Sequence, residues 1–141
     1  MNIAVRYQSR GGNTKAVAEA IAKAAASRAE PVGTPINGQA DILFIGGGVY
    51  AFNIDESLLS FLKELKPETA KSVAVFSTGM ITGGTGKITA ILKSNGINVC
   101  EKTLPIKMGI KNCAFLGGKG SVKLSGKTLG AVDDFVKASI K

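Results

Sequence analysis

The chain has 141 residues, of which 45% are hydrophobic, and this is enough for one globular domain with a buried core. No apolar run approaches the about 20 residues that a membrane-spanning helix needs, and the N-terminus lacks a signal-peptide layout, so we expect a cytoplasmic protein. Histidine is absent, and Cys100 and Cys113 have neither CxxC nor zinc spacing, so we expect no metal site and two buried or half-buried thiols.

Apolar, β-branched runs alternate with helical patterns along the chain. Strands are predicted at residues 3–7, 41–46, 72–77 and 98–104, and residues 30–36, with two prolines and a glycine, predict a short edge strand. Helices are predicted at residues 14–28, 85–94 and 125–140, and a further one is expected to begin at Asn53 as N-cap, with Glu56 as its capping partner. This alternation predicts an α/β fold, a parallel sheet with right-handed crossovers. The residues expected to face the core are Val17, Ile21, Ala24 and Ala25, then Leu58, Phe61, Leu62 and Leu65, then Ile88, Ile91 and Leu92, and finally Leu129, Val132, Val136 and Ile140.

The segment between the first predicted strand and the first predicted helix has the composition of a phosphate-binding loop. Its two glycines allow the backbone to approach a ligand closely, and the helix that follows supplies unpaired N–H groups and partial positive charge. The polar residues around the glycines add hydroxyl, amide and guanidinium donors. The segment therefore predicts a site for the phosphate of a nucleotide-like ligand, and its residues are Ser9, Arg10, Gly11, Gly12, Asn13 and Thr14.

Two more glycine-rich segments follow the second and third predicted strands. The first, residues 46–53, contains Tyr50 and Phe52, whose rings either stack on a planar ligand or cover the sheet edge. The second, residues 77–86, carries hydroxyls at Ser77, Thr78 and Thr82 that either bind ligand heteroatoms or belong to a mobile turn. Ligands of parallel sheets bind beyond the carboxyl ends of the strands, so we expect the three segments to converge on one edge.

Two motif matches in these segments are incomplete. Residues 46–51 fit a dinucleotide-binding fingerprint nominally, but the acidic residue at the required distance, Glu64, falls in a predicted helix. Residues 83–87 look like part of a P-loop, but Ile81 and Ile88 occupy positions that require glycine and Ser/Thr.

Residues 7–15, Tyr-Gln-Ser-Arg-Gly-Gly-Asn-Thr-Lys, resemble the N-terminal phosphate loop of the flavodoxin family. Residues 42–52 are similar to the ring-binding segment of that family, and residues 73–78 are similar to its next strand. The resemblance implies a three-layer fold with a parallel five-stranded sheet of order 2-1-3-4-5, non-covalent FMN and one-electron transfer. The family commonly has threonine where Gly11 stands, so one phosphate hydroxyl is missing here.

Carried over residue by residue, the resemblance implies FMN-binding residues in all three segments. The phosphate loop would hold the FMN phosphate. The second segment would border the isoalloxazine, with Tyr50 or Phe52 stacking on it, and the third would line the other side of the ring. The implied FMN-binding residues are Ser9, Arg10, Gly11, Gly12, Asn13, Thr14, Gly48, Val49, Tyr50, Ala51, Phe52, Thr78, Gly79 and Met80.

The net charge of +8 is concentrated toward the C-terminus. Residues 1–101 carry a net charge of +2 and residues 102–141 carry +6, with six lysines and no acid from Lys102 to Lys127. This basic region is interpreted either as a solvated face or as a docking surface for acidic redox partners; nucleic acid is disfavoured because arginine and interleaved aromatic residues are lacking. The stretch from Lys111 to Lys123 matches no pattern that we can place.

Three functions fit these features. An FMN-binding electron carrier needs no acid–base residue and therefore suits a chain without histidine. An FMN-dependent oxidoreductase acting on NAD(P)H or a quinone would need a substrate pocket over the ring. A flavodoxin-like domain that has lost FMN would act as an interaction module. We expect the electron carrier.

Overall fold

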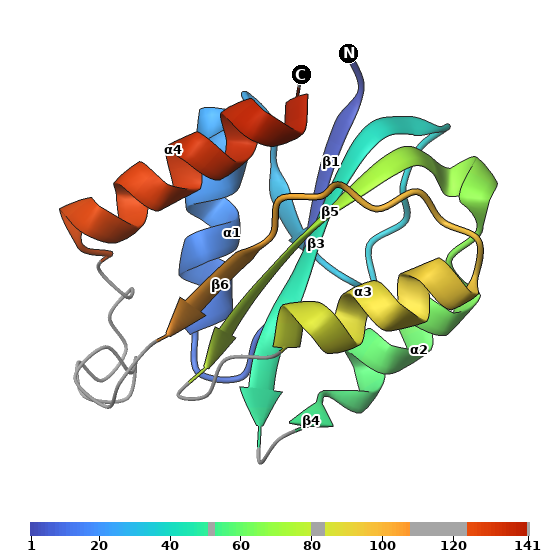
Figure 1. Ribbon diagram of the computed structural model, residues 1–141, viewed down its shortest axis with the longest axis horizontal. Coiled ribbons are helices and arrows are strands. Elements are labelled where there is room, and N and C mark those ends of the chain that lie inside the picture. Colours follow the sequence, from blue (N-terminus) through green and yellow to red (C-terminus); the bar gives the residue numbers. More distant parts are fainter. Residues whose placement is uncertain (51–52, 80–83, 108–123, 141) are drawn as a thin grey trace.

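The computed structural model describes residues 1–50, 53–79, 84–107 and 124–140, and it consists of a sheet between two layers of helices (Figure 1). Each strand of the main sheet except the last leads into the next through a helix or a short connection. The elements in chain order are β1 (Ile3–Gln8), α1 (Asn13–Ala24), β2 (Ala29–Pro31), β3 (Ala40–Tyr50), β4 (Asn53–Ile54), α2 (Glu56–Glu64), the 3₁₀ helix η1 (Pro67–Thr69), β5 (Ala70–Gly79), α3 (Gly84–Ser94), β6 (Leu104–Lys107) and α4 (Gly126–Ile140).

The main sheet is parallel. Over the described residues its strands lie in the order β2-β1-β3-β5-β6, and the two-residue β4 pairs with the end of β3 in antiparallel orientation. With the β4 hairpin set aside, this is the predicted order 2-1-3-4-5, because β4 shifts the numbers of the last two strands by one. The predicted three-layer α/β fold is confirmed.

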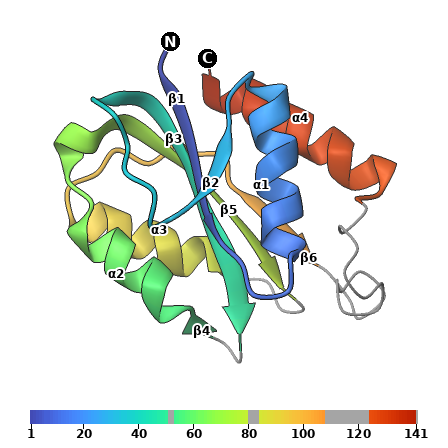
Figure 2. The same ribbon diagram turned by 180° about the vertical axis from the view of Figure 1, so that it is seen from behind.

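Two apolar cores lie on the two faces of the sheet. Helices α1 and α4 cover one face, and α2 and α3 cover the other (Figures 1 and 2). Alternate side chains of β3 serve the two cores: Phe44 packs with the first, and Leu43 and Ile45 pack with the second. The rings of Phe44 and Phe135 meet edge-to-face with centroids 5.6 Å apart, which joins α4 to the centre of the sheet.

Two predicted helix boundaries are wrong. Helix α1 ends at Ala24 rather than at residue 28, because Ala26 adopts a left-handed conformation with φ of 54°, and Ala24 is exposed instead of facing the core. The N-cap of α2 is Asp55, whose carboxylate accepts from the backbone N–H of Ser57. Asn53, the predicted N-cap, belongs to β4 instead.

The predicted last strand is displaced along the chain. Instead of residues 98–104, the sheet uses β6 at Leu104–Lys107, and Val99 contributes an isolated bridge to Val73. Pro105 lies in β6, where an edge position tolerates its missing N–H group. The other edge strand, β2, covers Ala29–Pro31 and is shorter than the predicted segment 30–36.

Most side chains predicted to face inward are buried or half-buried, and Leu129 is the second exception after Ala24. Leu129 is 44% exposed, because the buried stripe of α4 begins one turn later, at Val132. Cys100 is half-buried as predicted, and burial raises the pKa of its thiol, which keeps it neutral. Cys113 lies outside the described residues.

Candidate functional site

The segments predicted to bind a ligand follow three adjacent strands. β3 lies between β1 and β5, and all three run in the same direction. Gln8 at the end of β1 lies opposite Gly47, and Gly48 lies opposite Thr78 of β5. The predicted convergence on one sheet edge is therefore confirmed for the described parts of these segments.

The phosphate loop turns directly from β1 into α1. Gly12 is the N-cap of α1 and has φ of 94°, a left-handed conformation that favours glycine, and its N–H donates to the Ser9 hydroxyl over 3.0 Å. Among the described residues, no side chain caps this helix. The first-turn N–H groups, which have no partner inside a helix, are therefore left for an external acceptor at the positive end of the helix dipole.

Thr14 connects the phosphate loop to β5. Its hydroxyl oxygen lies 2.6 Å from that of Thr78, and the two residues are 1% and 3% exposed. The Thr78 side chain therefore points toward α1. The Thr78 hydroxyl, from the third predicted ligand-binding segment, therefore contacts the phosphate loop.

Two buried amide oxygens lack a partner among the described residues: Oε1 of Gln8, directly before the phosphate loop, and Oδ1 of Asn13, within it. Buried acceptors without a hydrogen bond are rare in proteins. A ligand that carries hydroxyl groups beside its phosphate would satisfy both oxygens, and FMN carries a polyhydroxylated ribityl chain next to its phosphate. The residues present therefore fit this cofactor.

The glycines that follow the predicted second strand are packing residues. Gly46, the last residue of the predicted strand, and Gly47, predicted to lie in a loop, both belong to β3; the strand continues to Tyr50, so the predicted loop from Gly47 to Tyr50 is wrong. A Cβ atom on Gly46 would collide with Phe76 of β5, and one on Gly47 would collide with Leu58 of α2. The absence of side chains here lets β3 run between its neighbours up to the site.

Close packing at a glycine also brings α3 to the site. A Cβ atom on Gly84, the first residue of α3, would collide with Val49 and would lie 3.1 Å from Cβ of Ser77. The N-terminus of α3 therefore packs directly against the ends of β3 and β5. Thr78, predicted to lie in a loop, belongs to β5, which continues beyond the predicted strand end at Ser77 to Gly79.

The predicted ring-binding residues are only partly described. Gly48 is buried, and Val49 and Gly79 are half-buried at the ends of β3 and β5. Tyr50 ends β3, where it pairs with Asn53 of β4. Ala51, Phe52 and Met80 lie outside the described residues, as do Ile81 and Thr82.

Comparison with known proteins decides the family. Residues 4–122 match the sequence model of the flavodoxin domain. The chain belongs to the flavodoxin family. Membership of this family implies a flavin cofactor and a role in electron transfer. No curated protein matches the chain in sequence.

Solved structures agree with the flavodoxin fold. Oxidised flavodoxin 2 from Bacillus cereus has a TM-score of 0.72 at 16% identity, over 99% of this chain and 98% of that one. A flavodoxin from the domain Archaea has a TM-score of 0.69 at 18% identity, over 100% of both chains. The rubredoxin oxygen:oxidoreductase of Desulfovibrio gigas has a TM-score of 0.73 at 12% identity, over 97% of this chain and 34% of that one. These likenesses show the shared fold.

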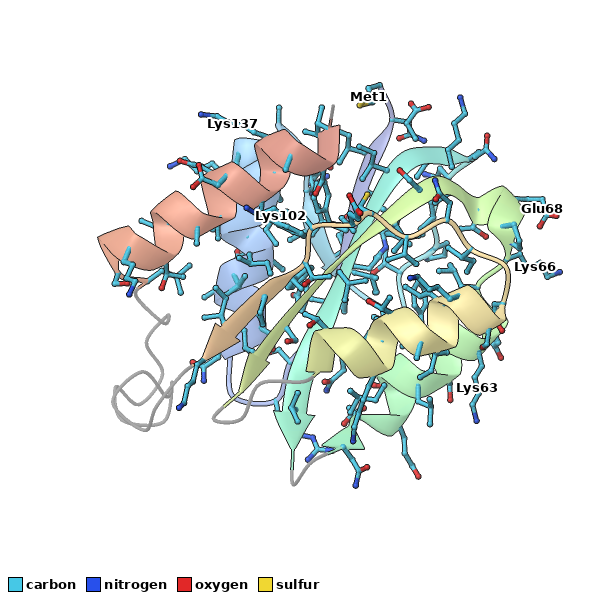
Figure 3. All side chains as sticks on the ribbon, in the orientation of Figure 1. Met1, Lys63, Lys66, Glu68, Lys102 and Lys137 are labelled. Carbon is cyan, nitrogen blue, oxygen red and sulfur yellow. The ribbon has the colours of Figure 1, made fainter. Side chains whose placement is uncertain are left out.

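This flavodoxin domain carries lysines on both helical layers and also on its strands and connections. Figure 3 shows Lys63 and Lys66 on the side of α2, and Lys137 on α4. Within the basic region, Lys102 and Lys107 are exposed, whereas residues 108–123 lie outside the described part of the chain. No helix among the described residues combines the length and apolar character needed to span a membrane.

Sequence reasoning missed Asp55. Its Oδ2 atom accepts from Nε and Nη2 of Arg10 at 3.0 and 2.8 Å, which links the N-cap of α2 to the phosphate loop. Hydrogen bonds from Ser57, then Arg10, lower the pKa of Asp55 to about 2. The signal in the sequence was a second capping residue two positions after Asn53, in front of the same helix.

Proposed function

We propose that this flavodoxin-family chain binds FMN non-covalently and carries electrons between redox partners. The uncapped N-terminus of α1, with a glycine N-cap and a buried threonine in its first turn, is the observation that supports this proposal. A phosphate placed there would accept from backbone N–H groups and from hydroxyls. Its proposed ligands are Ser9, Gly11, Gly12, Asn13 and Thr14; Arg10, which the resemblance also implies as a ligand, pairs with Asp55.

The proposed ring site lies beyond the ends of β3 and β5. When bound, FMN supplies the redox-active isoalloxazine ring. Residues Gly48 to Phe52 would border one side of the ring, with Tyr50 or Phe52 stacking on it, and Thr78, Gly79 and Met80 would border the other. These residues would hold the ring and exclude water from it.

We further propose that the partners are proteins with acidic docking surfaces that meet the basic region from Lys102 to Lys127. Charge complementarity of this kind raises association rates and is screened by salt. Electron transfer to a partner of this kind should therefore slow as ionic strength rises.

Flavin titration of the purified protein tests the proposal. We expect the apoprotein to quench the fluorescence of added FMN with a saturable curve, and the protein as purified to absorb at flavin wavelengths. A protein that quenches no FMN fluorescence even at high concentration would contradict both flavin functions and favour an interaction module without cofactor.

A second candidate, an FMN-dependent oxidoreductase, is favoured by one feature. An open groove of about 570 Å³ lies beside β4, between α2 and α3, and is lined by the apolar residues Ile54, Leu59, Ala90 and Ile91 and by the polar or charged residues Asn53, Glu56 and Lys87. This volume is in the range of small-molecule sites. Steady-state oxidation of NAD(P)H by the holoprotein separates the two functions: rapid turnover without a partner protein rules out a simple carrier.

A further inference from the structure

Arg10 and Asp55 form a charged pair across two separate segments of the site. Arg10 lies in the phosphate loop, and Asp55 lies between β4 and α2. Nε and Nη2 of the guanidinium donate to the same carboxylate oxygen, Oδ2, at 3.0 and 2.8 Å. The Arg10 side chain is 57% exposed, whereas that of Asp55 is 16% exposed, so the carboxylate is the shielded member of the pair.

The two oxygens of Asp55 have separate tasks. Oδ1 accepts from the backbone N–H of Ser57 at 2.8 Å and from its hydroxyl at 2.5 Å, which caps α2. Oδ2 accepts from Arg10. The carboxylate is thus fixed by the helix that it caps, and it offers the guanidinium a rigid acceptor.

The pair lies at one end of the predicted ring-binding segment. Asp55 directly follows β4, in which Ile54 pairs with Val49 and Asn53 pairs with Tyr50 at the end of β3. A tie between Arg10 and Asp55 therefore holds the far end of the β3–β4 hairpin to the phosphate loop. An arginine that is paired with a carboxylate is partly neutralised, and its paired donors are not available to a phosphate.

We propose that Arg10 is a positioning residue, which holds the ring-binding segment to the phosphate loop through Asp55 and is not a ligand of the flavin phosphate. This inference rests on the proposed binding of FMN at this edge of the sheet. The phosphate and the ring of FMN would then bind to two segments, the phosphate loop and the ring-binding segment, that the ion pair between Arg10 and Asp55 joins. Loss of either partner should loosen the ring half of the site and leave the N–H groups of α1 in place.

Flavin affinities of matched variants test the inference. FMN and riboflavin, which lacks the phosphate, are titrated against the apo forms of the wild type, Arg10→Gln, Asp55→Asn and the double variant. Asparagine keeps a capping oxygen for Ser57 and removes the charge that faces Arg10. Arg28→Gln removes one exposed arginine elsewhere in the chain and is the control for net charge.

We expect Arg10→Gln and Asp55→Asn to weaken the binding of both flavins by the same factor, about two- to fivefold for a partly exposed ion pair. The double variant should be no weaker than either single variant, because the two residues act as one unit. Arg10→Lys should behave like Arg10→Gln, since the single amino group of lysine cannot replace the two guanidinium nitrogens that donate together to Oδ2. The opposite pattern overturns the inference: a loss confined to FMN in Arg10→Gln, rescued by lysine, with Asp55→Asn neutral or tighter.

Hydrogen exchange in the flavin-free protein is the second measurement. The amides of Asn53 and Ile54, the two residues of β4 that pair with the end of β3, should exchange faster in both single variants than in the wild type and in Arg28→Gln. Unchanged exchange at these amides overturns the inference even if flavin binding changes. A wild type that binds neither flavin contradicts the proposed function instead, and the exchange data then decide by themselves whether Arg10 holds β4 in place.

Discussion

The hydroxyl oxygens of Thr14 and Thr78 lie 2.6 Å apart, and both side chains are buried. Two hydroxyls that share one hydrogen bond leave one proton to be donated elsewhere. With Thr78 as the donor, the remaining proton belongs to Thr14, in the first turn of α1, where we propose that the phosphate binds. Thr78 would then support the phosphate site from β5.

Replacement of Thr14 by alanine should weaken FMN binding by about 1–2 kcal/mol, because a hydroxyl bonded to a charged phosphate is lost. Fluorescence titration of the apoprotein measures this change. Riboflavin affinity should stay as in the wild type, because riboflavin has no phosphate. An unchanged dissociation constant for FMN would contradict the placement of its phosphate at Thr14.

Thr78→Val should weaken FMN binding by about 1 kcal/mol, because valine keeps the shape of threonine but cannot donate to the Thr14 hydroxyl that is proposed to bind the phosphate. In a Thr14→Ala background the same substitution should have little further effect. Ser72→Ala is a suitable control, because Ser72 is a half-buried hydroxyl residue near the other end of β5. An equal loss of riboflavin affinity in Thr78→Val would indicate that the Thr78 hydroxyl acts on the ring, which this residue is proposed to border, and not on the phosphate through Thr14.

The phosphate loop could be predicted from sequence because its signal is local. A short apolar strand, two glycines and the start of a helix are adjacent in the chain, and each limits the backbone without any distant partner. The parallel sheet could be predicted for the same reason, because strand-like apolar runs alternate with helical patterns along the chain. Neither inference required knowledge of which side chains meet across the fold.

The roles of the β3 glycines could not be predicted in this way. A glycine is compatible with a loop or with close packing, and the distinction depends on residues far along the chain. For Gly46 the deciding neighbour is Phe76, and for Gly47 it is Leu58. Asp55 illustrates the same limit, because Asn53 and Asp55 are both good N-caps and the choice between them depends on the pairing of β4 with β3.

A pair of glycine substitutions should separate packing from freedom of the backbone. Gly46→Ala should lower the free energy of unfolding by about 2–3 kcal/mol, because the new Cβ collides with the ring and the carbonyl of Phe76 inside the sheet. Gly11→Ala should change it by less than about 0.5 kcal/mol, since a Cβ at Gly11 meets no atom within 4 Å. Urea unfolding of the two apoproteins measures both values. Equal stabilities would contradict the packing role of Gly46.

Gly11→Thr should strengthen FMN binding. The position is exposed, has room for a side chain and lacks a left-handed backbone, so threonine fits without strain. An added hydroxyl donating to the phosphate contributes about 1 kcal/mol, or about fivefold in affinity. Gly11→Val is the matched control without a hydroxyl. Equal affinities of the threonine and valine variants would show that no phosphate oxygen lies within reach of position 11.

Asp55 should contribute to stability in a way that depends on pH. Hydrogen bonds from Ser57, followed by those from Arg10, lower its pKa in the folded protein to about 2, from an ordinary value near 3.8. A carboxyl with a depressed pKa stabilises the folded state above its unfolded pKa, and that contribution is lost as the pH falls toward the folded pKa. The difference in unfolding free energy between the wild type and Asp55→Asn should therefore be constant above about pH 5 and shrink between pH 4 and 2.

Asp41 also has a lowered pKa, because the N–H of Asn2 and then Lys71 donate to it. The same measurement is therefore made in an Asp41→Asn background, where the effect of Asp55→Asn should depend on pH in the same way. A difference that stays constant down to pH 2 would contradict the ion pair with Arg10 and the capping role together.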